Sequence, residues 1–152
     1  MHPALRRLLI GPAENSFGRY LGLLAAGTLF VATFAAYAFG VFAVSGCVVF
    51  IPGDAAVVGS IAAAVVGYSR GGLVFAWLVA YAPLLGYHAD HAFLGLSNRT
   101  VQYRLGYFIR VDGLAFLAVE GVVIGTVAFA VGYLGSLGVE FVRSGAEPER
   151  LR

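Results

Sequence analysis

The sequence predicts an all-α integral membrane protein, with four transmembrane helices in an antiparallel bundle. Of its 152 residues, 60% are hydrophobic and 12% are charged, whereas soluble domains carry about 25% charged residues. Long apolar runs recur along the chain, and glycine and proline interrupt them where helices are expected to end. The length fits one membrane domain over residues 1–152.

The first apolar run carries no charge from Tyr20 to Gly53. One helix over the whole run would be about 51 Å long, against a hydrocarbon core of roughly 30 Å. We therefore predict a span over 20–44, ended by glycine and proline further on. Cys47 follows Val-Ser-Gly and so resembles the lipidated cysteine of a bacterial lipobox, but the preceding apolar run is longer than a signal sequence uses. The alternative is a small residue in a membrane helix.

The next two spans are predicted at 54–69 and 71–90, joined by a tight turn. A single helix through both would place Arg70 in the middle of the membrane, where a charge is costly. A break at Arg70-Gly71-Gly72 moves the arginine to the interface instead. Asp54 would then lie in the first turn of its helix, where the helix dipole favours a carboxylate.

A polar interfacial linker is predicted over 91–112. Apolar and polar residues alternate within 97–113, and this period of two is typical of a strand. An isolated strand at a bilayer would leave its backbone groups unpaired. The segment therefore either pairs with a partner or forms an irregular or short helical linker on the membrane surface, and we favour the linker. Its tyrosines and arginines suit the membrane interface.

The last span is predicted over 113–138 and contains Glu120. A carboxylate at a helix centre costs about 3 kcal/mol on insertion scales, and the twelve large aliphatic and phenylalanine side chains contribute roughly −4 to −7 kcal/mol. The span should insert. The polar tail over 139–152 is expected to be frayed from Glu140.

Arginine positions predict a multi-pass protein of the cell membrane with both termini in the cytoplasm. With four spans, seven arginines lie inside and three outside, as the positive-inside rule requires. A three-span model gives six against three, so the break at Arg70 decides between the models. Asn98-Arg99-Thr100 is a glycosylation sequon and gives faint support to an outside location.

Small residues recur at helical spacing in two spans and predict close helix packing. The expected packing residues are Gly59, Ala63, Gly67, Ala118, Gly121, Gly125, Ala128 and Gly132. We expect these faces to pack within the monomer. The alternative is a homo-oligomer interface.

Glu120 is the main candidate for a proton or ion site, with Asp54 in the same outer half of the membrane. An ionisable residue at this depth is a functional candidate by default, and desolvation favours its neutral form. In helical projection Glu120 lies about 110° from the small-residue face, so it should point toward a different neighbour. The structural alternative is a protonated Glu120 that is hydrogen-bonded to that neighbour.

His88, Asp90 and His91 form a weaker candidate metal site. The two histidines are three residues apart and share a helix face if the helix continues past Pro83. Imidazole and carboxylate ligands together suit Zn²⁺ or Mn²⁺. No established metal-binding motif is present.

The sequence shows no catalytic motif and no cofactor-binding loop, and no basic run that would suggest nucleic acid. The leading prediction is a non-catalytic accessory or assembly-dependent membrane component. Its partners would be membrane lipid and a second copy of the chain or a membrane subunit. The alternative is an ion- or proton-coupled carrier or channel subunit that uses Glu120, and a membrane metalloenzyme is a third possibility.

Overall fold

The computed structural model describes residues 3–11, 16–43 and 52–146, and within these ranges the chain is helical without a strand. The all-α prediction is confirmed. The elements are α1 (Pro3–Ile10), α2 (Ser16–Ala38), α3 (Gly53–Tyr68), α4 (Leu73–Asp90), the π-helix η1 (His91–Gly95), α5 (Val101–Phe108) and α6 (Val111–Ala146).

Helix α2 ends at Ala38, six residues before the predicted end of the first span. Gly40 has a φ of 71°, and the amide of Val41 donates to the carbonyl of Ala36 while the amide of Gly40 donates to that of Tyr37. This is a Schellman motif, in which a glycine with positive φ closes a helix. The residues just after the predicted end of the span, which include Gly46 and the lipobox-like Cys47, lie outside the described residues.

The predicted turn between the second and third spans is present. Arg70 has a φ of 56° and Gly72 a φ of 99°, and the amide of Gly71 donates to the carbonyl of Val66. Helix α4 then continues past Pro83 to Asp90. Two helices therefore run through 54–90, as the sequence predicts.

The linker before the last helix is helical, and the strand alternative for it is wrong. The π-helix η1 extends α4. Thr100 precedes α5 and caps it, because its hydroxyl accepts a hydrogen bond from the amide of Tyr103 at 3.4 Å. Threonine is a favoured residue at the start of a helix because its side chain accepts a backbone hydrogen bond there. The capping threonine agrees with the helix that is observed, whereas the alternation of apolar residues does not.

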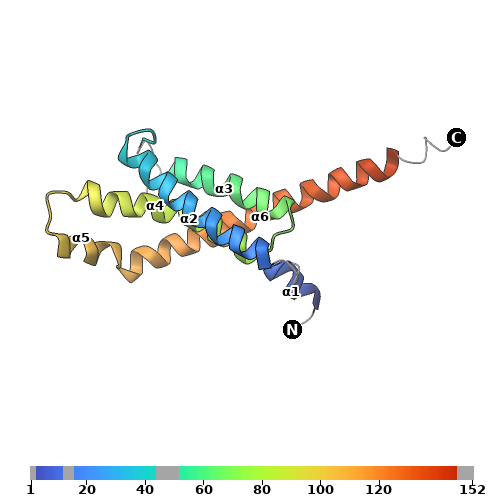
Figure 1. Ribbon diagram of the computed structural model, residues 1–152, viewed down its shortest axis with the longest axis horizontal. Helices are drawn as coiled ribbons and strands as arrows, with labels where there is room; N and C mark the ends of the chain where they lie inside the picture. Colours follow the sequence, from blue (N-terminus) through green and yellow to red (C-terminus); the bar gives the residue numbers. More distant parts are fainter. Residues whose placement is uncertain (1–2, 12–15, 44–51, 147–152) are drawn as a thin grey trace.

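Helix α6 runs without interruption from Val111 to Ala146. The expected fraying is therefore wrong for residues 140–146, which are helical. No proline occurs within this range, and isolated glycines are tolerated inside a helix. Figure 1 shows α6 projecting well past the other helices.

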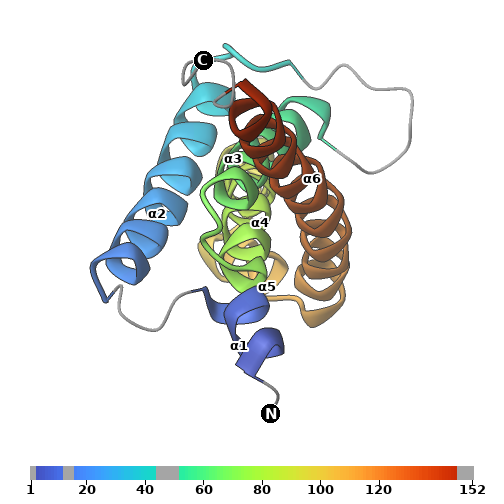
Figure 2. The same cartoon turned by 90° about the vertical axis from the view of Figure 1, so that its right-hand side faces the viewer.

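The four long helices α2, α3, α4 and α6 lie along one axis, and consecutive ones run in opposite directions (Figure 1). Helix α4 packs against the other three, and Figure 2 shows it between α2 and α6. Two described helices are long and apolar enough to cross a membrane: one within α2 (Tyr20–Ala38) and one within α6 (Val111–Ser144). Helix α3 is also apolar but shorter.

Candidate functional site

Glycine residues bring α3, α4 and α6 into close contact at one level of the bundle. A β-carbon on Gly59 of α3 would lie 2.8 Å from the carbonyl oxygen of Ala80, and one on Gly121 of α6 would lie 3.0 Å from the β-carbon of Tyr81. Both sites face the same turn of α4, from two different helices. Such approaches need glycine, because any side chain would meet a backbone or a fixed side chain.

The glycine face of α6 also packs against α3. A β-carbon on Gly67 would collide with the backbone of Phe129, and one on Gly132 would collide with the backbone of Ala64. Gly125 faces Ala76 and Trp77 of α4 at 3.0 Å. The small-residue faces are therefore covered by helices of the same chain.

Two residues of the predicted packing set need separate comment. Ala63 is fully buried in α3, within the cluster that also holds Ala76 and Ala80 of α4. Ala118 is exposed on α6, so it lies off the packed face. The buried stripe begins instead at Leu117.

Sequence reasoning missed the glycines that join α2 to α4. A β-carbon on Gly86 would lie 2.7 Å from the carbonyl oxygen of Phe30, and one on Gly22 would lie 2.6 Å from the ring of Phe75. Both glycines lie in predicted spans but outside any regular repeat of small residues. Their presence in apolar helices was the available signal.

Glu120 belongs to the buried part of the α6 surface. Its exposed fraction is 8%. It follows Leu117 by three residues and precedes Ile124 by four, and both belong to one apolar cluster with Ala55 of α3 and Leu84 of α4. Glu120 is therefore buried beside this cluster, and the direction in which it points relative to the small-residue face stays a prediction.

Neither carboxyl oxygen of Glu120 has a hydrogen-bond partner among the described residues, and both are buried. The hydrogen bond expected of a purely structural carboxylic acid is absent from that part of the chain. A buried carboxyl group without a partner carries a large cost when charged and a smaller one when neutral. This position therefore favours a proton on Glu120.

The depth of Glu120 follows from its place in a continuous helix. It lies about 12 Å along α6 from Asp112 and about 30 Å from Glu140. Because Gly121 meets Tyr81 and Gly59 meets the preceding Ala80, Glu120 lies at the level where α3, α4 and α6 meet. The carboxyl group is therefore within the bundle, nearer its α5 end.

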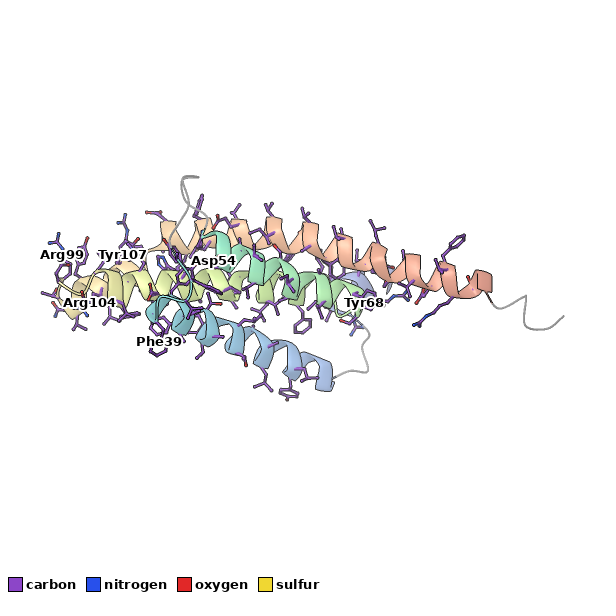
Figure 3. All side chains as sticks on the ribbon, turned by 90° about the horizontal axis from the view of Figure 1, so that it is seen from above. Phe39, Asp54, Tyr68, Arg99, Arg104 and Tyr107 are labelled. Atoms are coloured by element: carbon purple, nitrogen blue, oxygen red, sulfur yellow. The ribbon has the colours of Figure 1, made fainter. Side chains whose placement is uncertain are left out.

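Asp54 is in the first turn of α3 and is half-buried. It lies about 7.5 Å along the helix from Gly59, and so about that far from the level of Glu120. Figure 3 shows Asp54 set back from the end of the molecule that carries Arg99, Arg104 and Tyr107. The helix dipole stabilises a carboxylate here without further ligands.

The two histidines of the candidate metal site share a helix face, and both contact α5. The rings of His88 and His91 lie 5.4 Å and 5.6 Å from that of Tyr107, and Nε2 of His88 is 3.3 Å from the carbonyl oxygen of Phe108. No three His, Cys, Asp or Glu side chains gather as metal ligands in the part of the chain that the structure describes. The histidines instead attach α5 to the end of α4.

Arg104 has a role that the sequence did not reveal. Its guanidinium donates to the carbonyl of Arg99 at 3.0 Å, to that of Phe93 at 3.3 Å and to that of Ser97. It thereby closes the loop between η1 and α5. Arg99 lies over the ring of Tyr103 at 5.6 Å.

No protein-family model, no curated protein and no solved structure matches this chain.

Proposed function

We propose that this chain is a four-span membrane protein that couples transport to a proton carried by Glu120, as a carrier or a channel subunit. The observation that carries the proposal is the burial of both Glu120 oxygens without a described partner, where α3, α4 and α6 meet. Ionisable groups inside a membrane are costly and typically mark ion or proton pathways.

The four-span topology is supported by the exposed side chains of the bundle. Large apolar residues cover the outward faces of three helices. A soluble protein of this size rarely exposes so much apolar surface to water, whereas in a membrane these residues would contact lipid. Examples with exposed fractions above 55% are Leu24 and Val31 on α2, Val57 and Ile61 on α3, and Val127 and Val131 on α6.

The length of α6 agrees with this placement. Asp112 and Glu140 are about 42 Å apart along the helix, and a bilayer with its headgroups is about 40–45 Å thick. Both carboxylates would then lie among the headgroups, and Glu120 would lie within the hydrocarbon region. A short α3 suits the hairpin because Arg70 and Asp54 then flank its apolar part.

The glycine contacts weaken the alternative in which the small-residue faces join two copies of the chain. Gly121, Gly125 and Gly132 already face α4 and α3 of the same chain. Glu120 is the remaining feature whose cost packing does not explain. A proton is favoured over a metal ion because the described residues bring no further ligands to a common site.

The decisive test measures pH-driven flux by the purified chain in lipid vesicles, for the parent protein and Glu120→Gln. The amide keeps the size of the side chain but cannot exchange a proton. We expect Glu120→Gln to keep the helical spectrum and the unfolding temperature, and to lose the flux. Flux by Glu120→Gln equal to the parent's, or its absence from the parent, contradicts the proposal.

Glu120→Leu separates function from stability. Replacing a buried unpartnered acid by an apolar side chain should raise the free energy of unfolding by about 1–3 kcal/mol, measured by denaturation in detergent. A carboxyl group retained at that cost has a use outside packing. If Glu120→Leu instead destabilises the protein by a similar amount, Glu120 makes stabilising contacts and is structural.

A non-catalytic accessory component is the second candidate, and the free end of α6 favours it. Phe141 and Val142 are 81% and 70% exposed, and a β-carbon on Gly138 would meet nothing within 4 Å. This end of α6 is available to another membrane subunit. Chemical crosslinking from Phe141→Cys in native membranes tests it: a specific adduct supports the accessory role, and labelling by lipid-phase reagents alone contradicts it.

A further inference from the structure

The end of the bundle opposite α5 is built from three segments that the sequence keeps far apart. These are α1, the turn at 70–72 and the last turns of α6, and Figures 1 and 2 show α1 at this end. A β-carbon on Gly72 would lie 2.7 Å from the carbonyl carbon of Ile10, and one on Gly11 would lie 3.0 Å from the carbonyl oxygen of Gly71. Helix α1 is therefore fixed against the turn by close backbone contact.

Arg70 connects the turn to α6. Its guanidinium lies 2.7 Å from the carboxylate of Glu140 and 5.8 Å from the centre of the Tyr133 ring. The side chain of Arg70 remains 46% exposed. The planar guanidinium held in this way keeps further N–H donors for an anion such as phosphate.

The described charges at this end are unbalanced. Arg6, Arg70 and Arg143 are exposed there, and Glu140 is the one carboxylate among the described side chains of the three segments. The α5 end differs, because Arg104 is committed to backbone carbonyls, Arg110 lies 3.9 Å from Asp112, and Asp54 and Asp90 add negative charge. One end therefore has a surplus of free arginine side chains.

Exposed apolar side chains accompany these arginines. Leu8 of α1 is 44% exposed, Ile10 is 37% exposed, and Phe141 in the last turns of α6 is 81% exposed. Helix α1 would be about 12 Å long, too short to cross a membrane. A short helix that carries both arginine and exposed leucine is typical of a segment lying at the lipid–water boundary.

We infer that α1, the turn at 70–72 and the last turns of α6 form a binding surface for anionic phospholipid headgroups. The arginines bind the lipid phosphates, and Leu8, Ile10 and Phe141 enter the acyl boundary beside them. The surface does not involve Glu120, so it is independent of the proposed transport function.

Native mass spectrometry of the full chain tests the inference. The protein is transferred from micelles that contain either phosphatidylglycerol or phosphatidylcholine, and the lipid molecules that stay bound to it are counted. We expect the parent to retain phosphatidylglycerol in preference, and Arg6→Gln and Arg143→Gln each to weaken that retention about fivefold. Arg99→Gln is the matched control, since it removes an exposed arginine from the opposite end. Equal retention of both lipids, or an equal loss in Arg99→Gln, overturns the inference.

A second measurement locates α1 without relying on lipid affinity. A fluorophore on Leu8→Cys, in a Cys47→Ser background, should be quenched by lipids that carry a quencher high on the acyl chain. The quenching should weaken when phosphatidylglycerol is replaced by phosphatidylcholine. A fluorophore that only water-soluble quenchers reach places α1 off the membrane and overturns the inference.

Discussion

The guanidinium of Arg70 lies 2.7 Å from the carboxylate of Glu140, across 70 positions of sequence. This pair joins the turn between α3 and α4 to α6, just beyond the last long apolar stretch. The pair places the charge of the predicted turn and the charge of the predicted tail at the same level of the helix bundle. In a four-span protein, that level is the headgroup region of one leaflet.

The Arg70–Glu140 pair should contribute little to stability, because both side chains are about half exposed. Exposed ion pairs contribute about 0–1 kcal/mol. Glu140→Gln, Arg70→Gln and the double variant should therefore give a coupling energy below about 1 kcal/mol in denaturant unfolding. A coupling of several kcal/mol would show instead that lipid shields the pair from water.

Gly125→Leu should destabilise the monomer and leave its mass unchanged. A side chain at this position meets the carbonyl oxygen of Ala76 and the ring of Trp77 at 3.0 Å, and overpacking of this kind costs about 1–3 kcal/mol. Thermal unfolding and light scattering in detergent measure the two properties.

Gly135→Leu is the matched control, since it lies on the same helix and meets nothing within 4 Å. It should leave the unfolding temperature unchanged or slightly raised, because glycine is a poor helix former. If Gly125→Leu lowers the particle mass while its stability is kept, the glycine face joins protomers after all.

Arg104→Gln should loosen the loop between η1 and α5. It removes hydrogen bonds to the carbonyls of Phe93, Ser97 and Arg99, and charged hydrogen bonds contribute about 1.5–3 kcal/mol each when protected from water. Hydrogen exchange should increase over 93–100 while that of α6 stays constant. Arg99→Gln removes only a contact with the Tyr103 ring, so equal exchange in both variants would contradict this role of Arg104.

Cysteine labelling tests the four-span topology. In a Cys47→Ser background, an impermeant reagent applied outside should label Asn98→Cys and miss Ser69→Cys and Arg143→Cys. Ser69 is preferred to Arg70 because Arg70 has a positive φ and an ion-pair partner. Labelling of Asn98→Cys and Ser69→Cys from the same side would rule out α4 as a span, because α4 is the long helix that separates these two positions.

Much of the helix pattern could be predicted from the sequence because it depends on local chemistry. The turn at Arg70-Gly71-Gly72 is an example, since two consecutive glycines are poor helix formers and Gly72 adopts a positive φ there. The end of α2 was missed because Gly40 closes the helix while apolar residues continue beyond it. The linker was ambiguous because the alternation is typical of a strand, whereas an isolated strand would leave its backbone groups unpaired at a bilayer; the Thr100 cap at the start of α5 was missed.

By itself, the sequence determined three things. The chain is apolar and helical, most helices break at predictable positions, and Glu120 lies deep in a long helix. Only the tertiary structure decided which faces are buried. Helical projection separates Glu120 from the small residues, but α6 packs against two helices at once: Gly121 faces α4 and Gly132 faces α3. Contact with two neighbours buries a wider arc than one stripe of glycines, and that arc includes Glu120.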